Sequence, residues 1–157
     1  MLYTVPSPGP GRVSVMAKPR AGDWLGDDLA RLAAAGVGVL VSLLTPAEVA
    51  ETGLDGEPAA ARAAGLRFLH APVPDRSVPD ARFSAAVLPV LDACYGAGQH
   101  LVVHCRFGIG RSAAVAAAVL VRAGGDPARV WADIAAVRGV PVPDVDAQRR
   151  WVEKFVT

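Results

Sequence analysis

Short apolar segments rich in β-branched residues alternate with segments of helical periodicity, and this alternation restricts the fold more than any other feature of the chain. The segments that predict strands are 2–5, 12–17, 37–44, 66–71 and 100–104. The segments that predict helices are 24–35, 46–52, 57–64, 80–97, 112–123, 126–138 and 144–155. Strands that alternate with helices favour an α/β domain, in which a central and mostly parallel sheet is flanked by helices.

Local signals mark where several of these elements begin. The turn-rich sequence PSPGPG joins the first two apolar segments and predicts an opening hairpin. Thr45 and Glu48 match a capping box with Pro46 at the first helical position, so a helix should begin there. Asp80 and Asp144 are each placed to cap the helix that follows them.

The composition limits the classes of partner. The chain has 157 residues, enough for about one domain, which we expect to span residues 1–157. Its net charge of +1 indicates no nucleic-acid partner. The longest apolar run, 113–121, is too short to cross a bilayer, so we expect no membrane association. Two cysteines argue against a disulfide framework, and we therefore expect a reducing, cytoplasmic location.

The stretch VVHCRFGIGRSA places a thiol between a predicted strand and a predicted helix. Ligands of parallel sheets bind beyond the carboxyl ends of the strands, which is where Cys105 lies. Gly108 and Gly110 allow the loop backbone to turn its N–H groups inward as an anion nest before the helix begins. Arg111 carries a planar fork that matches two phosphate oxygens, and the Ser112 hydroxyl can donate to the sulfur. The loop is therefore predicted to hold a tetrahedral dianion above a nucleophilic thiolate.

The residues from His104 to Ser112 match the signature H-C-x-x-G-x-x-R-S of the cysteine-dependent protein tyrosine phosphatase superfamily. The chain length resembles the dual-specificity branch of that superfamily, and APVPDRSVPD resembles the acid loop of its kinase-associated phosphatase-like members. The resemblance implies a dual-specificity phosphatase fold, a phosphocysteine intermediate on Cys105 and an aspartate as general acid, with no metal and no cofactor. It also implies that the following residues bind phosphate: Arg106, Phe107, Gly108, Ile109, Gly110 and Arg111.

Three neighbours of Cys105 are expected to assist it. His104 should make supporting hydrogen bonds around the loop, and it is not expected to transfer a proton. The resemblance assigns Ser112 to assisting the departure of the thiolate, a role compatible with a place at the helix N-terminus. Arg106 is either a solvated side chain or one that helps to attract anions.

Four other residues are interpreted as structural. Cys94 is expected to be a small core residue, with a resolving role for oxidised Cys105 as the alternative. His70 and His100 lack Cys, Asp or Glu neighbours at zinc-binding spacing, so no metal site is predicted. Gln148 is expected at the surface, and the alternative implied by the resemblance is a glutamine that places water.

The general acid is sought among three aspartates that follow a Val-Pro pair: Asp75, Asp80 and Asp144. Asp75 follows strand 66–71, and it would reach Cys105 if that strand neighboured strand 100–104 in the sheet. The carboxylates of Asp80 and Asp144 are expected to be occupied as helix caps. Asp75 is therefore the favoured acid.

Two other functions remain open from the residues alone. A rhodanese-like sulfurtransferase also uses a cysteine in a backbone-lined loop, but it needs no upstream acid. A non-catalytic phosphate-binding module would be expected to lack the cysteine, arginine or acid, all of which are present. Within the loop Arg106 is the one basic residue, so a phosphorylated protein or a small phosphoester is preferred to an inositol lipid as substrate. Phe107 and Ile109 bear on the substrate only if they do not face the core.

Overall fold

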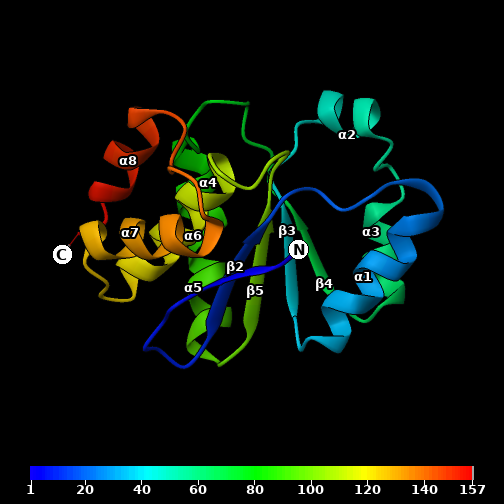
Figure 1. The fold of residues 1–157 in the computed structure, drawn as a ribbon, viewed down its shortest axis with the longest axis horizontal. Coiled ribbons are helices and arrows are strands. Elements are labelled where there is room, and N and C mark those ends of the chain that lie inside the picture. Colours follow the sequence, from blue (N-terminus) through cyan, green and yellow to red (C-terminus); the bar gives the residue numbers. More distant parts are fainter. Residues whose placement is uncertain (157) are drawn as a thin grey trace.

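The computed structural model describes residues 1–156 and contains a five-stranded sheet in the order β1-β2-β5-β3-β4. The strands are β1 (Tyr3–Val5), β2 (Arg12–Met16), β3 (Val39–Ser42), β4 (Arg67–His70) and β5 (His100–His104). β1 runs antiparallel to β2, and the other neighbouring pairs are parallel. The predicted opening hairpin and the mostly parallel sheet are therefore confirmed (Figure 1).

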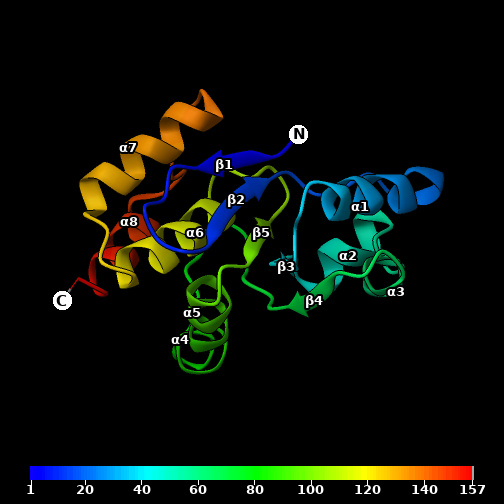
Figure 2. The same cartoon turned by 90° about the horizontal axis from the view of Figure 1, so that it is seen from below.

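Helices flank the sheet on both faces, as predicted. Figures 1 and 2 show α1 and α3 on one side of the sheet and the group from α4 to α8 on the other, while α2 lies beyond the end of β3. The helices are α1 (Leu25–Ala34), α2 (Pro46–Thr52), α3 (Glu57–Ala63), α4 (Ala81–Ala86), α5 (Leu88–Gly96), α6 (Arg111–Arg122), α7 (Pro127–Arg138) and α8 (Asp146–Glu153). A short 3₁₀ turn, Gly22–Trp24, precedes α1.

Both faces of the central strands are buried, because alternate side chains enter two separate apolar cores. In β5, Leu101 and Val103 belong to the core that includes α5 to α8, whereas Val102 belongs to the core that includes α1 and α3. α6 packs on β2 and β5 and is buried around its whole circumference, from Arg111 to Val121. Burial on both faces explains why these strands are almost continuously apolar in sequence.

The segment 80–97, predicted as one helix, folds as the two helices α4 and α5. Val87 separates them, and Pro89 lies in the first turn of α5. Proline has no backbone N–H, and its ring clashes with the carbonyl four residues earlier, so a continuous helix through Pro89 is disfavoured. The start of this segment agrees with the prediction, since Asp80 caps α4 by accepting the Phe83 N–H at 2.8 Å.

The strand order does not meet the condition set for the acid loop. Strand 66–71 would bring Asp75 to Cys105 if it neighboured strand 100–104, but β3 lies between β4 and β5. Ser42 is in register with both His70 and His104, so the three strands end level. The segments that follow them therefore leave from one edge of the sheet, and the loop after β4 must cross the end of β3 to reach Cys105.

Candidate active site

Cys105 lies at the floor of a short loop between β5 and α6. The side chain is buried, and its Sγ accepts the Gly108 N–H at 3.3 Å and lies 3.2 Å from the Ser112 Oγ. Gly108 has a φ of +77°, and a Cβ at this position would lie 2.7 Å from the backbone carbonyl carbon of Met16. A glycine is therefore required for the loop to turn back over the sulfur and direct a backbone N–H toward it.

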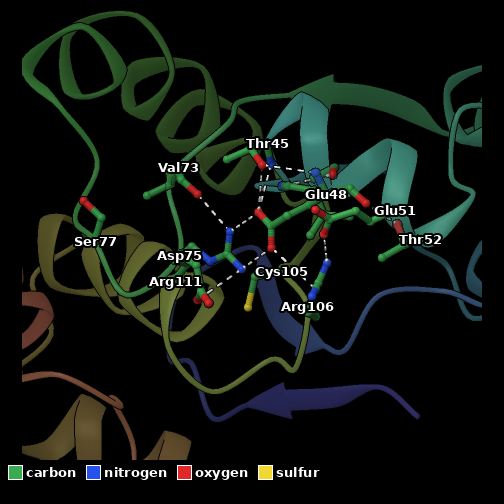
Figure 3. A network of polar contacts seen from close by, with 12 residues as sticks. Thr45, Glu48, Glu51, Thr52, Val73, Asp75, Ser77, Cys105, Arg106 and Arg111 are labelled. Atoms are coloured by element: carbon green, nitrogen blue, oxygen red, sulfur yellow. Dashed lines mark hydrogen bonds and ion pairs between the residues drawn. The ribbon is translucent and has the colours of Figure 1, made fainter.

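Arg111, the first residue of α6, is held in a fixed orientation by four contacts (Figure 3). Its Nη1 donates to Glu48 Oε1 at 2.7 Å and to the Val73 carbonyl at 2.9 Å. Its Nη2 donates to Glu48 Oε2 at 2.9 Å and lies 3.4 Å from Asp75 Oδ1. Burial lowers the pKa of Arg111, but the hydrogen bonds to Glu48 and the nearby negative charges of Cys105, Glu48 and Asp75 together outweigh this effect. The pKa of Arg111 is therefore raised, and the fork stays charged beside Cys105.

Glu48 is the site residue that the sequence did not reveal as such. The predicted capping box is present, with the Thr45 N–H donating to Glu48 Oε1 at 3.1 Å. The same carboxylate also binds Arg111, which is 63 residues away along the chain. This hydrogen bond lowers the pKa of Glu48 to about 2, against desolvation, which raises it. A residue with a sufficient local explanation thus has a second, long-range partner that local patterns do not show.

Breaking the Glu48–Arg111 pair should destabilise the protein and remove part of its acid sensitivity. The folded pKa of about 2 lies below the ordinary 4.5, so the pair stabilises the fold above about pH 4.5 and loses this effect as the pH falls toward 2. Glu48→Gln should lower the free energy of unfolding at about pH 7 by roughly 3 kcal/mol, because a buried guanidinium loses its anion. Urea unfolding at about pH 7 and about pH 3.5 measures both effects.

Glu51→Gln is the matched control for Glu48→Gln. Glu51 lies on the same helix, but its side chain is 63% exposed, and its one ion pair within residues 1–156 is with Arg106. Its loss should change the free energy of unfolding by less than about 1 kcal/mol. Equal destabilisation by the two substitutions, or an unchanged acid sensitivity in Glu48→Gln, would contradict the role given to the buried pair.

Arg106 contacts two acidic residues of α2. Its Nη2 donates to Glu51 Oε2 at 2.8 Å, and its Nε lies 3.6 Å from Glu48 Oε2. Neither of the expected alternatives, free solvation or free attraction of anions, describes this paired side chain fully. Arg111 differs from Arg106 because it is buried beside Cys105, so Arg111 and the backbone N–H groups are the donors placed nearest the sulfur.

His104 faces away from the sulfur and joins the loop to the opposite layer of the fold. Its Nδ1 lies 3.1 Å from the Cys105 carbonyl oxygen, and its Nε2 lies 2.6 Å from Glu57 Oε2. All three side chains are buried. Both ring nitrogens therefore have an oxygen partner within hydrogen-bonding distance. This geometry agrees with the supporting role expected for His104.

The loop after β4 brings Asp75 to the phosphate-binding loop, residues 105–111. Val73 donates its N–H to the Leu43 carbonyl at 3.0 Å, which carries the loop across the end of β3. A turn follows in which Ser77 N–H donates to the Pro74 carbonyl at 3.1 Å and Arg76 adopts a φ of +57°. The Asp75 side chain is 61% exposed at the apex of this turn, beside Arg111. Asp75 is thus accessible to a substrate and close to the predicted phosphate site.

The other two aspartates differ in their positions. The Asp80 carboxylate caps α4, as expected. Asp144 was expected to cap the last helix, but α8 begins at Asp146 with Val145 as its N-cap and without a side-chain cap. The Asp144 carboxylate instead fills the space that a Cβ on Gly110 would need. The structure therefore brings Asp75 and Asp144 to the loop, while Asp80 stays at its helix.

Gln148 corrects a sequence expectation, whereas Cys94 is the expected small core residue. Gln148 is fully buried rather than at the surface, and its Nε2 donates to the Ser77 carbonyl of the Asp75 turn at 3.3 Å. Cys94 is buried in α5, where its carbonyl accepts the Gln99 N–H at 3.1 Å, just before β5 begins. β5 then separates it from Cys105 by roughly 15–20 Å at about 3.3 Å per residue. A direct disulfide needs Cα atoms within about 7 Å, so the resolving role is not supported.

The two apolar residues of the loop face different surroundings. Phe107 is 64% exposed, whereas Ile109 is partly buried and packs against the larger core. Phe107 therefore stands at the rim of the loop, where it can contact a bound molecule, and Ile109 is structural.

Two further properties of the described chain bear on its function. Within residues 1–156, no group of three or more His, Cys, Asp or Glu side chains could hold a metal ion. In the same part of the chain, no helix combines the length and the apolar character that crossing a membrane requires.

A family model described as "Polymorphic toxin system, DSP-PTPase phosphatase" matches residues 14–125. The match includes part of β2, the acid loop, the Cys105 loop and the whole of α6. A search of curated proteins found no match.

Solved structures of phosphatases share the whole fold. Kinase associated phosphatase, with its catalytic cysteine replaced by serine, is 18% identical and has a TM-score of 0.87, covering 99% of this chain and 93% of that chain. A protein tyrosine phosphatase from Leishmania major is 20% identical with a TM-score of 0.78, covering 99% of both chains. PTPMT1 in complex with PI(5)P is 19% identical with a TM-score of 0.75, covering 98% of this chain and 94% of that chain. At these identities the likenesses establish the fold.

Proposed function

Because this chain belongs to the DSP-PTPase phosphatase family of polymorphic toxin systems, we propose that Cys105, Arg111 and Asp75 together hydrolyse phosphate monoesters. Membership confirms the superfamily indicated by HCRFGIGRS and the dual-specificity branch indicated by the chain length and the acid loop. It makes the chain a cysteine-dependent protein tyrosine or dual-specificity phosphatase. One observation carries this assignment. The Cys105 sulfur is surrounded by the Gly108 N–H, the Ser112 hydroxyl and the buried, charged guanidinium of Arg111.

In the first step, the Cys105 thiolate attacks phosphorus and the bond to the leaving oxygen breaks. The proton of the Asp75 carboxylic acid passes to that oxygen, which leaves as an alcohol or phenol. The loop N–H groups and Arg111 bind the non-bridging oxygens, which carry the charge of the transition state. Glu48 holds the Arg111 fork in place before the substrate binds, which lowers the activation free energy of this step.

In the second step, a water molecule attacks the phosphocysteine and the P–S bond breaks. The Asp75 carboxylate takes the proton of the water, and inorganic phosphate is released. The departing sulfur regains its negative charge, which the Ser112 hydroxyl and the Gly108 N–H stabilise by hydrogen bonds. His104 acts through the Cys105 carbonyl and takes no part in proton transfer.

We propose that the substrates are phosphorylated side chains of proteins, or small aryl phosphoesters, rather than inositol lipids. The single basic residue inside the loop, Arg106, is paired with acidic residues of α2, which leaves little charge for a second phosphate. Phe107 offers an exposed aromatic ring at the rim. PTPMT1 is similar in fold and was solved with PI(5)P, so the inositol lipid is the competitor to test. Initial rates on phosphotyrosine peptide, phosphothreonine peptide and PI(5)P, at equal concentration, decide between these classes.

We also propose a setting for this activity. Residues 1–157 act as one phosphatase domain in the cytoplasm, without nucleic acid or membrane as a partner. The net charge of +1 offers no general field for a polyanion. Both cysteines are free, and the nucleophile requires a reducing compartment to stay so.

The purified protein should hydrolyse p-nitrophenyl phosphate without added metal or cofactor. A chelator should leave the rate unchanged, because the loop and Arg111 supply the charge stabilisation. Vanadate and phosphate should inhibit by occupying the same loop. Activity that a chelator abolishes and zinc or magnesium restores would contradict this proposal. Sulfur transfer from thiosulfate to cyanide, in place of phosphate release, would favour the sulfurtransferase alternative.

A further inference from the structure

An anion-binding loop that turns its N–H groups inward must turn carbonyl oxygens outward, and two of these carbonyls share one partner. Arg138, the last residue of α7, donates from Nε to the Gly108 carbonyl at 3.0 Å and from Nη2 to the Phe107 carbonyl at 3.1 Å. We propose that Arg138 is a positioning residue that fixes the phosphate-binding loop in its anion-binding conformation. The inference rests on the proposed function of the same loop.

The two carbonyls identify the peptide groups that Arg138 holds. The Phe107 carbonyl belongs to the same peptide plane as the Gly108 N–H, which donates to Cys105 Sγ at 3.3 Å. A trans peptide places its C=O and N–H on opposite sides. A donor that binds the oxygen from outside therefore directs the N–H toward the sulfur. The Gly108 carbonyl fixes the next plane, that of the Ile109 N–H, in the same way.

The loop needs such a partner because its own sequence does not fix it. Gly108 is in the left-handed region. A glycine has no Cβ, so the peptide planes on either side of it rotate more easily than they would at another residue. Among the loop and turn hydrogen bonds of residues 1–156, no backbone N–H donates to the carbonyl of Phe107 or of Gly108. The guanidinium thus supplies two donors where the backbone supplies none.

Arg138 is itself held from the far side. Its guanidinium lies 4.0 Å from the ring centroid of Tyr3, in the edge strand β1, and α7 packs against β1. A planar fork that stacks on an aromatic ring and donates two parallel hydrogen bonds is specific to arginine. Tyr3 of the opening hairpin thus holds Arg138 of α7, and Arg138 in turn holds the phosphate-binding loop.

Arg138→Met should weaken binding of inorganic phosphate by about 10-fold, measured by calorimetry in the Cys105→Ser background, where no turnover occurs. With Cys105 present, kcat/KM should fall by about 10- to 100-fold, and by the same factor on p-nitrophenyl phosphate and on a phosphotyrosine peptide. Equal factors are expected because the loop contacts the transferred phosphoryl group and not the leaving group. Asp75 variants, by contrast, should discriminate between these esters.

Arg129→Met is the matched control, since Arg129 lies on the same helix with its side chain 78% exposed and paired with Asp133. It should retain the phosphate affinity and rate of the parent protein. Arg138→Lys keeps the charge but lacks the fork, so it should also lose phosphate affinity, by about 3-fold or more. This variant carries the test if Arg138→Met does not fold.

Three outcomes would decide the proposal. Unchanged phosphate affinity in a folded Arg138→Met or Arg138→Lys protein would overturn it, because the fork would then be unnecessary. A loss of affinity in both, with Arg129→Met unaffected, supports it. If the protein binds phosphate but hydrolyses no ester, a loss of affinity in the Arg138 variants would still support the positioning role, while the proposed catalytic function would fail.

Discussion

Cys105→Ser should lower the turnover of p-nitrophenyl phosphate by about 10⁴-fold or more, while inorganic phosphate still binds. A serine hydroxyl is a far weaker nucleophile than a thiolate at neutral pH. Phosphate binding should persist, because the loop N–H groups and Arg111 remain. Steady-state kinetics and calorimetry with phosphate measure the two properties separately.

Cys94→Ser controls for the general loss of a buried thiol. Cys94 is buried in α5, at the end of the sheet opposite Cys105, and should keep full activity when replaced. A mass increase of one phosphoryl group after rapid acid quenching, present with Cys105 and absent with serine, would identify the intermediate. A Cys105→Ser protein that keeps about a tenth of the rate would rule out covalent catalysis at this residue.

Much of the fold could be predicted from the sequence because its signals are local. Period-two and continuous apolar segments indicate strands, the capping box at Thr45 marks the start of α2, and glycines mark helix ends. The order of the strands is a property of tertiary packing, and nothing local shows that β3 inserts between β4 and β5. Pro89 is a local signal for the division of segment 80–97, because it lies in the first turn of α5.

The centre of the site could be predicted because the signature is contiguous, whereas its supports could not. Glu48 and Arg138 reach the loop from α2 and α7, and each has a sufficient local explanation, as a capping residue and as a basic residue in a last helical turn. Gln148 is expected at the surface as a polar residue, but it lies on the inward face of its helix with Trp151 and Val152. Residues that act on a loop from a distance are visible only when the layers are assembled.

Tertiary packing also explains how Asp75 reaches the Cys105 loop, although β4 does not neighbour β5. Leu43 and Arg111 bind the backbone of Val73, so the loop is tied to both β3 and α6. Two residues further on, the Asp75 carboxylate stands at the mouth of the site, 3.4 Å from the guanidinium that would bind phosphate. A dianionic phosphoester would repel a carboxylate there, so the protonated form of Asp75 is the one suited to a bound substrate.

Asp75→Asn should therefore slow hydrolysis of a phosphotyrosine peptide by about 10²- to 10⁴-fold. The loss should be much smaller on p-nitrophenyl phosphate, whose leaving group needs little protonation as its bond to phosphorus breaks. The basic limb of the pH–rate profile, which reports a required acid, should flatten in this variant. The ratio of kcat/KM on the two esters is the measurement that separates loss of an acid from a general disturbance of the loop.

Two other aspartates serve as comparisons for Asp75. Asp80→Asn removes a carboxylate that caps α4, so it should reduce stability by about 1 kcal/mol and leave the ester ratio unchanged. Asp144→Asn is the stricter comparison, because the Asp144 carboxylate also lies against the loop, at Gly110. Asp144 makes no ion pair with Arg111, whereas Asp75 does, so the ester ratio of Asp144→Asn should also stay near that of the parent protein. If Asp144→Asn or Asp80→Asn changes the ratio and Asp75→Asn does not, the acid is that residue, and the turn at Asp75 serves another purpose.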